Sequence, residues 1–170
     1  MSKTTLVAVD TNILIYLTTP PDRAAPLQRK ATALFEQLRA DKQIAIALPS
    51  IVIGEYLSHS AYQDNLAEVL GELQTQFIIL PFDTKAAKIY ARLMHHKPLG
   101  GVYEQYKAQE GIPRRCIHAD LTILATVEAH GVATLYTGER KDLIPIIAQK
   151  AALRIEVKKL DDIITQSRLL

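Results

Sequence analysis

The chain has 170 residues, of which 48% are hydrophobic and 22% are charged, a composition typical of one globular domain. Its 20 lysines and arginines against 18 aspartates and glutamates give a net charge of +2, which neither requires nor excludes a nucleic-acid partner. One cysteine, Cys116, excludes an intrachain disulfide, and no apolar run is long enough to predict a membrane span. We therefore expect a single domain over residues 1–170, in the cytoplasm.

Short apolar runs bounded by polar residues predict buried strands of the kind found in parallel sheets. There are five such runs along the chain, at residues 6–9, 44–48, 77–80, 132–136 and 154–157. Between them, apolar residues at helical spacing predict helices at about residues 11–17, 27–38, 51–57, 66–77, 84–94 and 118–130. Strands that alternate with helices predict an α/β fold, here a three-layer α/β/α sandwich with a five-stranded parallel sheet.

Several helix starts carry capping chemistry, and one stretch lacks helical or strand periodicity. Ser50 can cap the helix at 51–57, and Asp83 or Thr84 can cap the helix that follows. Residues 95–115 contain two prolines and three glycines, so we expect a long loop or insert there.

Acidic side chains follow three of the predicted strands. Asp10 comes directly after the first strand, Glu55 lies about one helical turn beyond the second, and Thr137, Glu139 and Asp142 follow the fourth. The carboxyl ends of parallel strands share one edge of a sheet, so these groups are expected to meet there. Clustered carboxylates repel one another, and a divalent cation is the simplest compensation.

Asp120 is placed less tightly by this argument, because it opens the helix that leads into the fourth strand. Helical geometry groups Asp120 with Ile117, Leu121 and Leu124, which predicts a half-buried carboxylate. Such a carboxylate costs free energy unless a positive charge compensates it. This makes Asp120 a further candidate metal ligand.

Each acidic position also has a structural interpretation. Asp10 belongs to the residue types preferred at a helix N-cap, and Glu55 can belong to a solvated helix face. Glu139 and Asp142 lie in a Gly-Glu-Arg-Lys-Asp stretch that is typical of a polar turn. Thr137 either orients a carboxylate or a water molecule by its hydroxyl, or merely ends the strand.

In combination, these segments resemble the PIN domain family, and within it the VapC-type ribonucleases of bacterial toxin–antitoxin pairs. The matching segments occur in the family's order, at residues 10–12, Glu55, residues 119–126, residues 135–139 and residues 142–143. The resemblance implies a five-stranded parallel sheet, an acidic pocket that binds Mg²⁺ or Mn²⁺, and endonucleolytic cleavage of RNA. It also implies a homodimer and an antitoxin protein as partner.

The resemblance assigns roles residue by residue. Asp10, Glu55 and Asp120 match the three principal acids of the family, and Glu139 stands where the fourth acid is usually an aspartate. Asp142 matches a further acidic position. These implied roles make Asp10, Asp120, Glu55 and Glu139 the expected metal ligands, with the ion activating water and stabilising charge on the scissile phosphate.

The stretch at residues 95–115 combines basic and aromatic residues, which suits single-stranded RNA. The candidate RNA contacts are Asn12, Lys97, Tyr103, Tyr106, Arg114 and Arg115. A solvated surface segment or a dimer contact is the alternative for this stretch. For the whole chain, the alternatives to an RNA-cleaving enzyme are a catalytically weak or inactive PIN-like module that binds RNA or protein, and a nuclease or phosphatase acting on DNA.

Overall fold

A parallel sheet of five strands forms the centre of the computed structural model, which describes residues 4–18, 26–58, 64–108, 114–138 and 143–167. The spatial order is β3-β2-β1-β4-β5. The bounds are Thr5–Val9 for β1, Ile44–Pro49 for β2, Ile78–Leu80 for β3, Thr134–Thr137 for β4 and Glu156–Lys159 for β5. Ala8 of β1 pairs with Ala47 on one side and Leu135 on the other, so β1 is the central strand. The predicted α/β fold with a five-stranded parallel sheet is confirmed.

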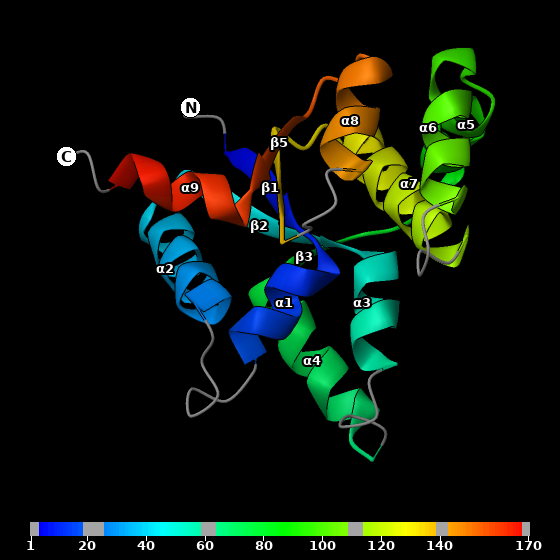
Figure 1. Cartoon of the computed structure of the whole chain (residues 1–170). Coiled ribbons are helices and arrows are strands. Elements are labelled where there is room, and N and C mark those ends of the chain that lie inside the picture. The colour runs from blue at the N-terminus through cyan, green and yellow to red at the C-terminus, as the bar shows by residue number, and fades with distance from the viewer. Residues whose placement is uncertain (1–3, 19–25, 59–63, 109–113, 139–142, 168–170) are drawn as a thin grey trace.

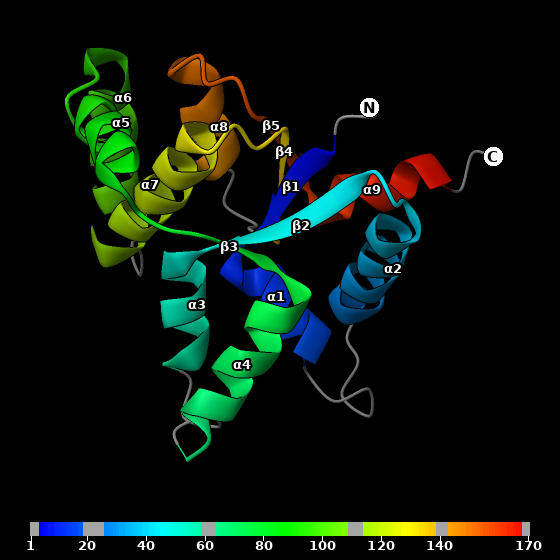
Figure 2. The ribbon, with the colours of Figure 1, turned by 180° about the vertical axis from the view of Figure 1, so that it is seen from behind.

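Helices cover both faces of this sheet. Their bounds are Thr11–Thr18 (α1), Pro26–Ala40 (α2), Ser50–Leu57 (α3), Leu66–Gln76 (α4), Thr84–Met94 (α5), Lys97–Ala108 (α6), Arg114–Ala129 (α7), Leu143–Lys150 (α8) and Leu160–Ser167 (α9). The helices α5 to α8 gather on one side of the sheet, and α2 packs beside α9 on the other (Figures 1 and 2). Apolar residues of the strands, such as Val9, Leu48 and Leu135, are fully buried between these layers.

The strand β4 begins two residues later than the sequence predicts, because Val132 takes part in the turn that ends α7, and Ala133 joins this turn to the strand by donating its amide to the Leu6 carbonyl at 2.8 Å. Gly131 has a φ of 68°, a left-handed conformation that glycine adopts without steric cost, and the Val132 amide donates to the Val127 carbonyl. The strand therefore starts only once this helix-terminating turn is complete.

Residues 97–108 form the helix α6, where a loop or insert was expected. Leu99, Val102 and Tyr103 are buried, at a spacing that puts them on one helical face. Their burial against neighbouring helices outweighs the low helix propensity of Gly100 and Gly101. The prediction of an irregular stretch was wrong here because it weighed local propensity and not packing.

Two helix starts also differ from the prediction. The helix α7 begins at Arg114, so Asp120 lies in its second turn and does not open the helix. Ser50 is the first residue of α3 and makes no capping hydrogen bond; its hydroxyl instead accepts from the Phe82 amide at 3.3 Å. The cap expected at Asp83 is confirmed, because its carboxylate accepts from the Ala86 amide at 2.8 Å.

Within the described part of the chain, none of the helices combines the length and apolar character that crossing a membrane requires.

Candidate functional site

Asp10 stands at the end of the central strand, where β1 gives way to α1. Only 2% of its surface is exposed, and its Oδ1 accepts from the Ile13 amide at 3.0 Å. The residue therefore is the N-cap of α1, as its structural interpretation predicted. The second carboxylate oxygen is left for other partners, so capping and a functional role are compatible.

The neighbouring strand β4 supplies those partners. The Thr137 hydroxyl donates to Asp10 Oδ2 at 2.5 Å, and the Gly138 amide donates to the same oxygen at 3.2 Å. Thr137 is itself fully buried. The hydroxyl of Thr137 thus orients the carboxylate of Asp10, which was one of its two predicted roles.

Gly138 permits this close approach between β4 and α1. A Cβ atom added at Gly138 would lie 2.9 Å from Cε2 of Tyr16 and 3.0 Å from Cβ of Asn12. Contacts this short require the ring or the helix to shift. A side chain at residue 138 is therefore incompatible with the present distance between its amide and Asp10.

The electrostatics of Asp10 are unfavourable for a charged carboxylate. Burial raises the pKa of the Asp10 carboxyl above its ordinary value of 3.8, and the nearby negative charge of Glu55 raises it further. Hydrogen bonds from Thr137, Ile13 and Gly138 act in the opposite direction without cancelling the rise. Among the described lysines, arginines and histidines, none forms an ion pair with Asp10.

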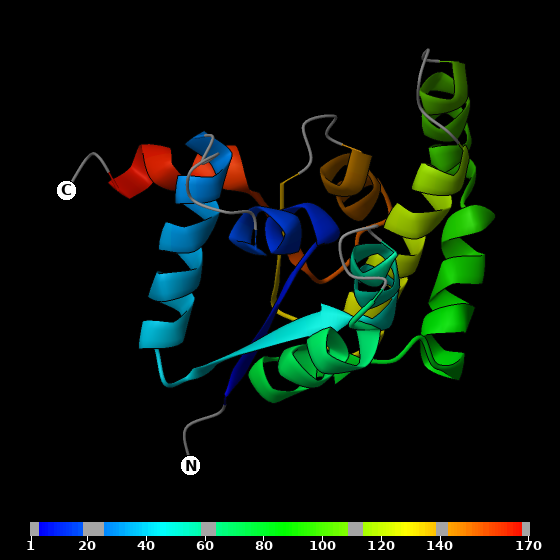
Figure 3. The same cartoon turned by 90° about the horizontal axis from the view of Figure 1, so that it is seen from below.

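Glu55 is the second acid that the structure brings to this edge. It is half-buried on α3, and its Oε2 accepts a short hydrogen bond from the hydroxyl of Thr11. Thr11 directly follows Asp10, so the first turn of α1 links the two carboxylates. The helices α1 and α3 lie side by side at the end of β1 (Figure 3).

The remaining predicted acids are Asp120, Glu139 and Asp142. Asp120 is half-buried on α7, a helix that contacts α3, while Glu139 and Asp142 lie outside the described residues. Within the described ranges, no three histidine, cysteine, aspartate or glutamate side chains are close enough to hold one metal ion. Asp10 and Glu55 are therefore linked through the first turn of α1, and the described residues supply no three-ligand group around them.

The predicted RNA contacts fall into three groups. Three of them are exposed, as an RNA contact requires: Asn12, Lys97 and Arg115. The structure does not describe the side chains of Tyr106 and Arg114. Tyr103 is only 7% exposed, and its hydroxyl donates to the Leu93 carbonyl at 2.9 Å. Its ring packs α6 in the core and is not free to stack on a base, which corrects the sequence-based expectation.

Sequence reasoning missed two residues of the site, Thr11 and Gly138. Both stand in short polar segments that follow strands, Asp10-Thr11-Asn12 and Thr137-Gly138, where such residues are commonly assigned to caps and turns. Their partners, Glu55 and Asp10, are 44 and 128 residues away in the chain. Only the pairing of the strands and helices reveals what they contact.

The family model of the PIN domain matches residues 7–145, which include Asp10, Glu55, Asp120 and Thr137. The match spans most of the chain. The chain belongs to the PIN domain family. The resemblance to the PIN domain family that the sequence motifs carried is confirmed.

Solved structures of similar fold come from VapBC proteins. VapBC2 from Rickettsia felis, bound to a DNA fragment from its promoter, contains a chain that is 19% identical with a TM-score of 0.57, over 91% of the present chain and 98% of that chain. A chain of VapBC-1 from nontypeable Haemophilus influenzae is 14% identical with a TM-score of 0.57, over 92% of the present chain and 99% of that chain. VapBC-5 from Mycobacterium tuberculosis is a member of the VapBC family of toxin–antitoxin systems. Its matching chain is 19% identical with a TM-score of 0.51, over 91% of the present chain and 98% of that chain.

At these identities the likeness concerns the fold alone. A search of curated proteins found no significant match to the chain.

Proposed function

We propose that this PIN-domain protein is an endoribonuclease that requires Mg²⁺ or Mn²⁺ and hydrolyses RNA phosphodiester bonds. The observation that carries the proposal is the buried carboxylate of Asp10, which has Glu55 near it and no cation of the described chain paired with it. A buried carboxylate beside a second one is costly unless positive charge arrives from outside the chain.

The donor set fits a hard divalent cation. Carboxylate oxygens are the ligands that Mg²⁺ and Mn²⁺ prefer, and Asp10 and Glu55 both offer them at one edge of the sheet. We assign Asp10, Glu55, Asp120 and Glu139 as the residues that would hold the ion, with Asp142 as a further acid beside them. A divalent ion held there would supply positive charge for the phosphate group under attack by water.

The chain's own residues prepare this site in three ways. Thr137 and the Gly138 amide fix the carboxylate of Asp10, while Thr11 fixes that of Glu55. Burial of Asp10 keeps bulk water from screening its charge. The exposed residues Asn12, Lys97 and Arg115, with Tyr106 and Arg114, are proposed to contact the RNA strand.

We further propose a toxin role of the VapC type, with an antitoxin protein as partner and a homodimer as the working form. The fold shared with chains of VapBC structures supports this role, since one of these is described as a toxin–antitoxin system. Toxicity on expression that a co-expressed small partner protein relieves is the result expected in cells.

The decisive experiment compares two site variants with a matched control. Asp10→Asn and Glu55→Gln each remove a charge at the site, and Asp162→Asn removes a charge from an exposed residue of α9. Cleavage of a mixed RNA pool with Mn²⁺ should fall at least about a hundredfold in the site variants and stay unchanged in the control. A wild-type rate of RNA cleavage in Asp10→Asn would contradict the assignment of this site to catalysis.

A second candidate is a PIN-domain module that binds RNA or protein without cutting it. Thermal unfolding with and without Mn²⁺, measured together with RNA cleavage, separates this module from the enzyme. That candidate is favoured by one observation, that no three acid, histidine or cysteine side chains of the described residues form a metal-binding group. A ligand that binds only the folded state raises the unfolding temperature. Stabilisation by Mn²⁺ without any RNA cleavage would select the module.

A further inference from the structure

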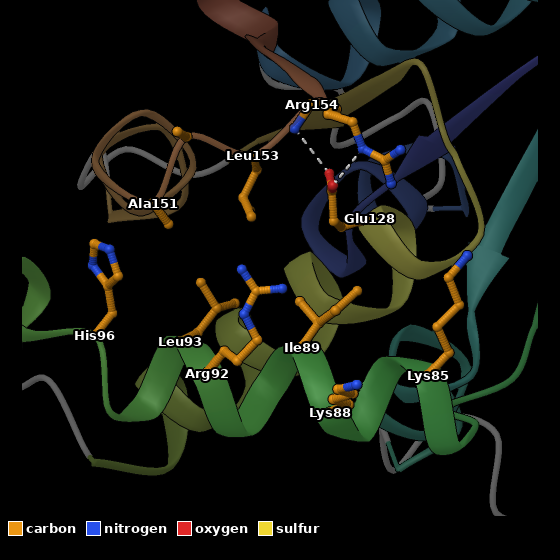
Figure 4. Close-up of a pocket in the computed structure, with 11 residues that line it drawn as sticks. Lys85, Lys88, Ile89, Arg92, Leu93, His96, Glu128, Ala151, Leu153 and Arg154 are labelled. Carbon is orange, nitrogen blue, oxygen red and sulfur yellow. Dashed lines mark hydrogen bonds and ion pairs between the residues drawn. The ribbon is translucent and has the colours of Figure 1, made fainter.

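A second site lies apart from the acids, between α5, the end of α7 and the turn that precedes β5. It is a pocket of about 390 Å³, within the size range of ligand sites in proteins (Figure 4). Two of its lining residues, Glu128 and Arg154, come shortly before β4 and β5, whereas Asp10 directly follows β1 and Thr137 ends β4. The pocket and the acidic site are therefore at different ends of these strands.

The floor of the pocket is apolar. Ile89 and Leu93 project into it from α5, and Leu153 points toward them from the opposite wall (Figure 4). Leu93 is buried, and Ile89 and Leu153 are half-buried. An aliphatic group placed between them would lose contact with water at little steric cost.

Cations surround this floor along one face of α5. Lys85, Lys88 and Arg92 follow one another at helical spacings of three and four residues, which brings like charges together. Lys85 donates to the Ala129 carbonyl at the end of α7. Within the described ranges, Lys88 and Arg92 form no ion pair.

The acid in the pocket does not neutralise these cations, because it already has a partner. Glu128 is 8% exposed, and its two carboxylate oxygens accept from Nε of Arg154 at 2.8 Å and from the Arg154 amide at 3.0 Å. The dashed lines in Figure 4 mark this pair. Lys88 and Arg92 thus leave a positive surplus beside an apolar floor.

A second, smaller hollow of about 240 Å³ borders the pocket: it shares Glu128 and Arg154 and is otherwise lined by Gly131, Val132 and Ala133. Two adjoining hollows suit an extended chain better than a single small ion. The described lining carries no aromatic ring apart from the imidazole of His96, so it offers little for an RNA base to stack on.

We infer that this pocket binds an acidic peptide segment of a partner protein. An aliphatic side chain of the segment occupies the floor of Ile89, Leu93 and Leu153, and its carboxylates pair with Lys88 and Arg92. Charge complementarity selects the acidic sequence, and the apolar floor selects a peptide over a nucleic acid. The inference does not depend on nuclease activity.

The test measures binding of fluorescein-labelled short peptides that alternate glutamate with leucine, by fluorescence anisotropy on the full chain. A 2′-O-methyl RNA of similar length is the competing probe. Arg92→Glu and Lys88→Glu reverse a charge at the pocket, and Lys42→Glu makes the same change at an exposed turn residue outside it. We expect each pocket variant to weaken peptide binding at least about tenfold, and the control to leave it within twofold.

Three outcomes would overturn the inference. The wild-type chain fails to bind the peptide, or Arg92→Glu binds it as well as the wild type, or the RNA probe binds in preference and is lost in the same two variants. Unfolding temperatures of all variants verify that the fold is retained. Loss of RNA cleavage in Asp10→Asn with peptide binding intact would show that the two sites are independent.

Discussion

Two buried carboxylates of this protein have opposite electrostatic surroundings. Glu128, beside the basic pocket, is 8% exposed and is held by the guanidinium and the amide of Arg154. Asp10, at the acidic edge, is 2% exposed and receives hydrogen bonds from a hydroxyl and from backbone amides. Glu128 therefore has a positively charged partner within the fold, whereas the charged neighbour of Asp10 is another acid, Glu55.

This difference distinguishes a structural carboxylate from one suited to binding. A carboxylate with an arginine partner already has its counter-charge within the fold and has little left to offer a ligand. A carboxylate that is oriented by neutral donors, but not neutralised, retains its affinity for a cation from outside. The same reasoning applies in reverse to Lys88 and Arg92, which are cations without described acidic partners.

The largest effect is expected where β4 approaches Asp10. Gly138→Ala would place a Cβ 2.9 Å from the Tyr16 ring, so either the ring or the Gly138 amide must shift. Overpacking of this kind costs roughly 1–3 kcal/mol in the free energy of unfolding. Urea denaturation measures this cost.

The matched control for that variant is Gly71→Ala in α4, where a Cβ would meet nothing within 4 Å. This variant should be neutral or slightly stabilising, because alanine favours a helix. Equal stability of the two alanine variants would contradict the close approach at Gly138.

A smaller effect is expected when Glu128 loses its arginine. Arg154→Met keeps much of the apolar stem but leaves a buried carboxylate with the backbone amide as its donor. An incompletely satisfied buried acceptor of this kind costs about 1–2 kcal/mol. Lys158→Met, which removes a cation from an exposed pair with Glu156, should cost less than about 1 kcal/mol. A chemical denaturation series that ranks the two variants in reverse would refute the contrast.

The smallest effect concerns a third ionisable group, on the pocket side. Burial raises the pKa of the Tyr103 phenol from its ordinary value of 10.0 to about 12, and the nearby Tyr90 adds to this rise. Between these two pH values the unfolded chain has lost the phenol proton and the folded chain keeps it, so stability should fall as the pH rises through this window.

Tyr103→Phe removes this contribution and should flatten the loss of stability between pH 10.0 and about 12. The variant also loses the hydrogen bond to Leu93, so it should be slightly less stable at neutral pH. Unfolding free energies of the wild type and the variant at pH 8 and pH 11 give both the loss of stability at the lower pH and the change in its pH dependence. An identical pH dependence in the two proteins would show that this phenol ionises normally.

The sequence by itself determined the sheet and its acidic edge. Apolar runs such as residues 7–9 and 46–48 are buried on both faces, so local composition is enough to identify them as strands. Asp10 follows directly from the end of its strand, and parallel topology brings Thr137 to the same edge. Family resemblance then supplied the chemistry expected of these residues.

Only the tertiary structure decided the environment of each side chain. The helix at Lys97–Ala108 and the burial of Tyr103 depend on packing against other helices, which local propensity does not contain. The partners of Thr137 and Thr11 are 127 and 44 residues distant, and the pocket cations on α5 face a turn before β5. Contacts across such separations are set by which elements become neighbours, so they follow from the fold and cannot be read from any single segment.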